Sequence, residues 1–390
     1  MAVSVPFDEQ YLEDLMEGAG IDALLATTKH NVQHLLGGYR FFFFAHADAT
    51  GVSRYLPAVG IVRGKLDDSF YIGAGNEDWG TAGGAIWVSD IQNISWTSID
   101  TARAAAAALE KRGLARATIG VEKSFIPADA LDTLRELLPE ATFVEVHPVL
   151  ESLRGVKSER ELELVRTASH GIIDSMQASF GLVQPGMTKH DIAEIFRLEQ
   201  TKRGLFYEYA LVTLGGGSMN RSPSSDVWRS GTSLSIDSGG MYEGYIGDLS
   251  RMAIDTEPTA RQTDLLAQIE TVQQEARTAV AAGKRGGDIF VTALDTISKL
   301  PDGANMKFVA HGMGLITHEV PRLTSTGPVP YFGAHANDPL KSGMVLSIES
   351  WFEDHDSGFI KLEDTLIVTD DGWEAPGDSA RGWNRTGASL

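Results

Sequence analysis

The chain has 390 residues, enough for one large domain or two of ordinary size. It carries 53 Asp and Glu residues against 33 Lys and Arg, a net charge of −20, which argues against nucleic acid or an anionic membrane as a partner, because both bind positive surfaces. The absence of cysteine excludes disulfides and thiolate ligands, so any bound metal must be held by carboxylates and imidazoles.

The chain opens without the basic and apolar segments of a signal peptide, and no apolar run approaches the ~18 residues of a membrane-spanning helix. Hydrophobic residues make up 43% of the sequence, which is ample for a sizeable core. We therefore expect a cytoplasmic globular protein with no membrane span.

The first 150 residues alternate between helix and strand patterns. Helices are predicted over 11–18, 101–112 and 127–138, from helix-forming residues bounded by glycine or proline. Strands are predicted over 21–27, 59–63, 70–73, 117–122 and 143–146. This alternation is typical of an α/β domain with a largely parallel sheet.

Longer helices begin after residue 150. Ser158 and Glu161 form a capping-box pattern ahead of a helix with one buried face, and Thr188 caps a second helix. A similar succession of helix, break and helix occurs at 184–195 and 286–297, which indicates two related halves that form one site between them. Further predicted elements are a helix over about 262–281 and strands over 211–214, 233–236 and 251–254.

Five residues of the second half lie in contexts that suit a metal ligand. Asp237 ends the predicted strand Leu-Ser-Ile-Asp, and Glu349 follows a second Leu-Ser-Ile run. Asp248 lies in Gly-Asp-Leu-Ser, His311 in Ala-His-Gly-Met-Gly and Glu363 in Lys-Leu-Glu-Asp. Each residue taken singly is more often a cap, a turn residue or a structural side chain, but their joint occurrence favours a shared site.

Four buried carboxylates brought together would repel one another, and even one isolated buried carboxylate is costly. Two divalent cations resolve both problems, because carboxylate oxygens and an imidazole nitrogen are ligands that Mn, Fe, Co and Zn accept. Such a pair activates a bridging water and holds the entering and leaving oxygens of a reaction. We therefore predict two divalent metal ions on these five residues.

This constellation resembles the signature of the pita-bread metallopeptidase family, which includes Xaa-Pro aminopeptidase, prolidase and creatinase. The order of the five residues and the His-Glu-Val-Pro segment at 318–321 are similar to that signature. The segment 153–158 resembles the hinge ahead of the family's catalytic domain, and 31–38 resembles part of its N-terminal domain. The resemblance covers nearly the whole chain.

The resemblance implies an organisation. It implies an α/β (α+β) fold, with a creatinase/prolidase-like N-terminal domain over 1–152 and a pita-bread, metal-binding catalytic domain over 153–390. It also implies a homodimer in which the N-terminal domain reaches the partner's active site, so that Arg40 is a candidate substrate contact.

The resemblance further implies roles for single residues. Glu349 would accept the proton of the metal-bound water, and His318 would donate a hydrogen bond to the developing oxyanion. Manganese is among the expected metals. The implied metal ligands are Asp237, Asp248, His311, Glu349 and Glu363.

Several positions depart from the family's pattern. The glycine-rich stretch 214–223 lacks the usual histidine and has Asn220 and Arg221 in its neighbourhood; Arg221 could bind a substrate carboxylate and Asn220 could donate a hydrogen bond. Glu349 is followed by Ser-Trp where Pro-Gly is usual. Lys361 stands where an arginine is common, and it is a further candidate substrate contact.

Three functions therefore stay open. The intact ligand set favours a metal-dependent hydrolase that cleaves a peptide or amide C–N bond, in an Xaa-Pro-like dipeptide or small amide, through a metal-bridging hydroxide. The departures resemble branches of the family that act on small non-peptide molecules, which implies, as an alternative, a metal-dependent lyase on a small zwitterion such as dimethylsulfoniopropionate. The third is a non-catalytic binding protein on the same scaffold, which metal content would distinguish from the two enzymes.

Overall fold

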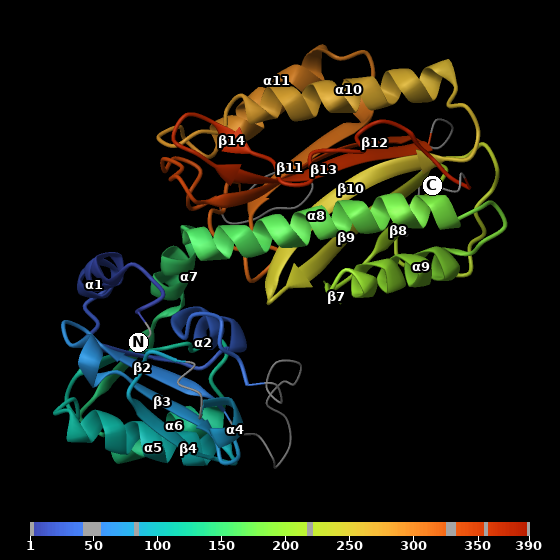
Figure 1. Ribbon diagram of the computed structural model, residues 1–390. Helices are drawn as coiled ribbons and strands as arrows, with labels where there is room; N and C mark the ends of the chain where they lie inside the picture. The colour runs from blue at the N-terminus through green and yellow to red at the C-terminus, as the bar shows by residue number, and fades with distance from the viewer. Residues whose placement is uncertain are drawn as a thin grey trace. The chain divides into compact units, whose positions relative to one another are not determined.

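The computed structural model describes residues 4–41, 56–81, 86–216, 221–324, 333–354 and 358–387 (Figure 1). The fold is mixed α/β, as predicted, and it separates into two compact units, Met1–Arg154 and Gly155–Leu390. Within the described segments, no helix is both long enough and apolar enough to cross a membrane.

The N-terminal unit contains a six-stranded sheet. Its strands are β1 (Ala23–Ala26), β2 (Ala58–Val62), β3 (Phe70–Ala74), β4 (Asp90–Ser95), β5 (Thr118–Val121) and β6 (Thr142–Glu145), in the order β4-β3-β2-β1-β5-β6. Three of the five pairs are parallel, which fits the largely parallel sheet that the sequence predicts, and the exceptions are the two pairs in which β2 is antiparallel to β1 and β3. The link from β2 to β3 is too short for the crossover that parallel neighbours need.

Helices cover both faces of this sheet (Figure 1). Side chains of β1 alternate between two apolar cores: Leu24 packs in a cluster with α1, α2 and α7, and Leu25 in a cluster with α5 and α6. The helices are α1 (Glu9–Gly18), α2 (Lys29–Leu35), α4 (Asp78–Thr81), α5 (Ser98–Lys111), α6 (Ala128–Leu137) and α7 (His147–Gly155), with a 3-10 turn at Leu66–Asp68.

The C-terminal unit contains a nine-stranded sheet, whose main path is β11-β12-β13-β10-β9-β7. β8 pairs with β9, β14 with β13 and β15 with β10. The strands are β7 (Phe206–Tyr207), β8 (Leu211–Leu214), β9 (Leu234–Tyr242), β10 (Tyr245–Ile254), β11 (Met306–Gly312), β12 (Val345–Asp354), β13 (Gly358–Val368), β14 (Trp373–Glu374) and β15 (Asn384–Arg385).

Two pairs of helices pack on this sheet: α8 (Glu159–Leu182) with α9 (Lys189–Lys202), and α10 (Ala260–Arg277) with α11 (Asp288–Lys299). A 3-10 turn follows at Gly303–Asn305. The predicted caps are confirmed, because Ser158 forms a capping box with Glu161 at the start of α8, and Thr188 caps α9. The predicted succession of a long helix and a shorter one therefore occurs twice, each time ahead of strands of the sheet (Figure 1).

The packing of these helices decides which face of the sheet is left for a site. Ile236 and Leu249 belong to the apolar cluster with α8 and α9, and Ile348 and Leu362 to the cluster with α10 and α11. Each of the four is next in sequence to a predicted metal ligand. Because adjacent strand residues point to opposite faces, the helices cover one face and the predicted ligands lie on the other.

β9 continues beyond Asp237, where the sequence predicted the end of a strand. The strand passes through Gly239 and Gly240 and ends at Tyr242. A Cβ atom on Gly239 would lie 2.6 Å from the ring of Tyr209, and one on Gly240 would lie 2.9 Å from a glutamine of α9. The two glycines therefore allow close neighbours instead of turning the chain, and Asp237 is fixed inside a strand.

Candidate metal centre

Asp237 and Asp248 come from the hairpin of β9 and β10. Asp237 is paired with Ser250, and Asp248 lies two residues before Ser250 on the same strand. Residues two apart on a strand share a face, so the two aspartates are diagonal neighbours on one side of the sheet. The hairpin register is thus the physical reason for their spacing in the sequence.

The other three predicted ligands come from β11, β12 and β13. Glu349 and Glu363 are directly opposite each other, and His311 is opposite Ser347, two residues before Glu349. Ser250 of β10 is opposite Glu363, which joins the hairpin to these strands. Pairing register alone therefore places the five residues, one from each of five strands, on the same face.

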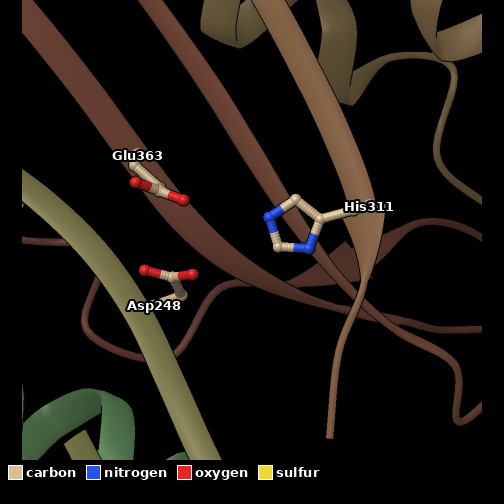
Figure 2. A group of neighbouring side chains, drawn as sticks. All are labelled: Asp248, His311 and Glu363. Carbon is tan, nitrogen blue, oxygen red and sulfur yellow. The ribbon is translucent and has the colours of Figure 1, made fainter. Parts of the chain in front are cut away.

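The donor atoms of these residues converge in two groups. One oxygen each from Asp248 and Glu363 and one ring nitrogen of His311 lie within 4.8 Å of one another, as do single oxygens of Asp237, Glu349 and Glu363. Figure 2 shows the carboxylates of Asp248 and Glu363 facing each other, with the His311 ring beside them. Glu363 belongs to both groups, so it is placed to bridge them.

Burial makes these carboxylates costly to ionise. Burial raises the pKa of Asp237 and of Glu363 above the usual range, although Lys361 opposes the rise. For Asp248, burial and then repulsion by Glu363 and Asp237 raise the pKa well above its usual value. Buried acids that repel one another in this way gain most from a bound cation.

His311 offers a ligand of a different kind. Burial lowers its pKa to about 4, so the ring is neutral near pH 7 and keeps a lone pair on one nitrogen. Its Nδ1 lies 3.3 Å from the carbonyl oxygen of Gly312, which can only accept, so a hydrogen bond there leaves Nε2 with the lone pair. A neutral imidazole among buried carboxylates fits a divalent transition metal.

Three residues that support the centre were missed by the sequence reasoning. The Tyr209 hydroxyl donates to Oδ1 of Asp248 at 2.6 Å, and the Ser347 hydroxyl donates to Oε1 of Glu363 at 2.8 Å. Thr365 accepts a hydrogen bond from the backbone N–H of Asp248. Ser347 could have been found by strand alternation, since it precedes Glu349 by two residues, but nothing in the sequence points to Tyr209.

His318, the predicted oxyanion donor, lies next to His311, with ring centroids 3.9 Å apart. Burial, then His311 and Lys361, lower its pKa, so the ring is neutral and can donate one N–H. The adjacent Glu319 is buried and forms an ion pair with Lys157 at 3.0 Å. This internal pair anchors the segment that carries His318.

Lys361 lies inside the centre. Its Nζ is 2.5 Å from Asp237 Oδ2, 2.5 Å from Glu349 Oε2 and 2.8 Å from Glu363 Oε2. Burial alone would lower the pKa of this lysine, but the three carboxylates hold it well above its usual value. The residue is 1% exposed, and its ammonium forms ion pairs with three carboxylates of the centre.

The other predicted substrate contacts lie in different surroundings. Arg221 is 3.2 Å from Asp237 Oδ2, and 30% of its side chain is exposed. Arg40 belongs to the N-terminal unit, where it donates to Gln33. Asn220 lies outside the described residues. Their contacts with substrate stay predictions.

Comparison with known proteins places the chain in a family. Residues 163–370, more than half of the chain, match metallopeptidase family M24, and residues 10–156 match the creatinase/prolidase N-terminal domain. The chain is 25% identical over 377 residues to YkvY of Bacillus subtilis, whose name proposes a dipeptidase; the match covers 93% of this chain and 95% of that protein. It is 22% identical over 260 residues to an Xaa-Pro dipeptidase of Pyrococcus horikoshii, covering 65% and 71%.

Solved structures show the same fold. A prolidase from Pyrococcus horikoshii is similar with a TM-score of 0.75 and 18% identity, covering 95% of this chain and 98% of that one. An X-Pro aminopeptidase from Thermotoga maritima is similar with a TM-score of 0.73 and 18% identity, covering 96% and 99%. The chain therefore belongs to metallopeptidase family M24, as a metal-dependent hydrolase with a creatinase/prolidase N-terminal domain ahead of its metallopeptidase domain.

Proposed function

We propose that this chain hydrolyses a C–N bond in a short peptide of the Xaa-Pro dipeptide class, using divalent metal held at the candidate centre. The observation that carries the proposal is the convergence of Asp248, His311 and Glu363, two buried acids and a neutral imidazole, on one face of the sheet. The Xaa-Pro dipeptidase among the relatives supports the substrate class.

In the proposed reaction, the bound metal and three side chains of the chain have separate roles. A bound metal would acidify water and polarise the scissile carbonyl. Glu349 is the proton acceptor in our proposal, because it is the most exposed of the five candidate ligands, at 8%, and so the one best placed to meet water. The neutral ring of His318 donates its N–H to the oxygen that becomes negative. Arg221, partly exposed beside Asp237, is the candidate partner for a substrate carboxylate.

The test is turnover by chelator-stripped protein with and without added Mn²⁺. The panel holds an Ala-Pro dipeptide, an Xaa-Pro tripeptide, a dipeptide without proline, a small linear amide and dimethylsulfoniopropionate. We expect Mn²⁺-dependent release of proline from the dipeptide. Cleavage only of peptides that lack proline would overturn the substrate class, and elimination from dimethylsulfoniopropionate with silence on every peptide and amide would overturn the hydrolase.

A further inference from the structure

Lys361 brings a fixed positive charge into the group formed by Asp237, Glu349 and Glu363. Its Nζ lies within 2.8 Å of an oxygen of all three. Those residues are also one of the two groups whose oxygens converge closely enough to hold a metal ion. The ammonium therefore stands where a cation bound to these three carboxylates would stand.

The geometry allows only one cation there. A divalent transition metal lies about 2.0–2.2 Å from its carboxylate oxygens. An ion bound to the same three oxygens would have to lie almost on top of Nζ, and it would meet a like charge. Lys361 lies inside β13, where it is paired with Trp351 of β12, and its side chain is 2% exposed.

Charge balance points the same way. When all four are ionised, Asp237, Asp248, Glu349 and Glu363 carry four negative charges, and Lys361 and Arg221 supply two positive charges, both in contact with Asp237. Two negative charges remain, which one divalent ion neutralises. The second group of donors, Asp248 and His311 with Glu363, includes no basic side chain within ion-pair distance of Asp248 among the residues that the structure describes.

We propose that the chain holds one divalent ion, on Asp248, His311 and Glu363, and that the ammonium of Lys361 replaces a second ion among Asp237, Glu349 and Glu363. The inference rests on the proposed function, because it concerns the same metal centre. It gives Lys361 a positioning role: the ammonium orients the Glu349 carboxylate and neutralises Asp237, so Lys361 is not a substrate contact. It also replaces the pair of ions that the sequence led us to expect.

The experiment measures metal content directly. Stripped wild-type protein and the Lys361→Met variant are saturated with Mn²⁺ and desalted, and bound Mn²⁺ per chain is counted by elemental analysis. We expect one ion per wild-type chain and two per Lys361→Met chain, because methionine keeps the stem and removes the charge. Lys307→Met, at an exposed lysine of β11, which lies two strands from β13, is the matched control and should keep one ion. Two ions per wild-type chain, or one in Lys361→Met, would overturn the inference.

A second variant keeps the test decisive if Lys361→Met does not fold. Asp237→Asn removes the charge of one of the three acids that contact Lys361. We expect this variant to retain one Mn²⁺ ion per chain, with the electron paramagnetic resonance spectrum of an isolated ion, as in wild type. An exchange-coupled pair of Mn²⁺ ions in wild-type protein, together with a single ion in Asp237→Asn, would overturn the inference. That result would still agree with the proposed metal-dependent hydrolase. Binding of no metal by wild type would instead overturn the proposed function.

Discussion

Asp248 differs from the other three acids of the centre in its neighbours. Asp237, Glu349 and Glu363 all contact the Lys361 ammonium, whereas the donor to the Asp248 carboxylate is the neutral hydroxyl of Tyr209. Burial and repulsion from its acidic neighbours leave this carboxylate the most costly to ionise. At the scale of single residues, Asp248 is therefore the group whose charge depends most on a metal ion.

We expect Asp248→Asn to weaken Mn²⁺ binding by more than about 10–100-fold. A loss of roughly that size follows removal of a residue that only hydrogen-bonds to a metal ligand, whereas Asp248 is itself a proposed ligand. The metal-free variant should be at least as stable as metal-free wild type, because the amide oxygen still accepts from Tyr209 and the repulsion is relieved. Calorimetric titration measures the affinity for Mn²⁺, and thermal unfolding of the metal-free proteins measures their stability. Asp174→Asn, at an exposed aspartate of α8, is the control, and wild-type affinity in Asp248→Asn would refute its role as a ligand.

Tyr209 acts on the metal through Asp248. We expect Tyr209→Phe to keep the fold and to weaken Mn²⁺ binding about 10–100-fold, because the hydroxyl that orients the carboxylate is removed. Binding is measured by the same titration. Tyr242→Phe, on the neighbouring β9, is the matched control. Equal affinities for the two variants would show that the Tyr209 hydrogen bond has no part in metal binding.

At the scale of elements, β13 carries two charged systems on its two faces. Glu363 points to the metal centre, and the next residue, Asp364, is buried on the helix-covered face. Asp364 forms ion pairs of 2.5–2.8 Å with Arg251, Arg277 and Arg381. These ion pairs connect β10, α10 and the C-terminal segment to β13, the strand that carries Glu363 and Lys361.

We expect Asp364→Asn to lower the free energy of unfolding by about 3–5 kcal/mol near pH 7, the cost of breaking a buried charge pair from one side. Urea unfolding measures it, with Asp370→Asn, at an exposed site, as the control expected to change stability by less than about 0.5 kcal/mol.

The same variant has a pH signature. Burial would raise the pKa of Asp364, but the three arginines outweigh it and hold the pKa well below its usual range. The contribution of a carboxyl with a lowered pKa is present above its unfolded pKa of ~3.9 and is lost as the pH falls below that value. The difference between wild type and variant should therefore shrink below about pH 4. A difference that is constant over this range would contradict the assignment to Asp364.

At the scale of the whole molecule, the sequence predicted most elements and the residues of the centre. Periodicity and caps placed α8 and α9, because Ser158 and Thr188 act locally. The five ligand candidates could be named because their residue types and contexts are unusual together. Their convergence is explained by strand register, which a local pattern does not determine.

The remaining features depend on contacts between distant segments. Tyr209 meets Asp248 from 39 residues away. The strand was predicted to end at Asp237, because the Tyr209 ring that Gly239 accommodates is not visible in the sequence. Lys361 was noted as a departure, but the direction of its side chain follows from the pairing of β13. The antiparallel position of β2 was likewise decided by tertiary pairing.

The predicted homodimer is a property of the whole molecule, and it stays a prediction. Sedimentation velocity should give a species of twice the 42.1 kDa chain mass. A single species at the chain mass would contradict the dimer, and Arg40 would then lose its expected place at a partner's active site.

The most direct test of the central claim is a titration of stripped protein with Mn²⁺, followed by the rate of proline release from an Ala-Pro dipeptide. The account predicts no turnover without metal, and a rate that rises and levels off at one equivalent of Mn²⁺ per chain. Turnover by metal-free protein would contradict the claim that Asp248, His311 and Glu363 serve the reaction through a bound ion. A rate that levels off only at two equivalents would keep the metal-dependent hydrolase and exclude Lys361 as the replacement for a second ion.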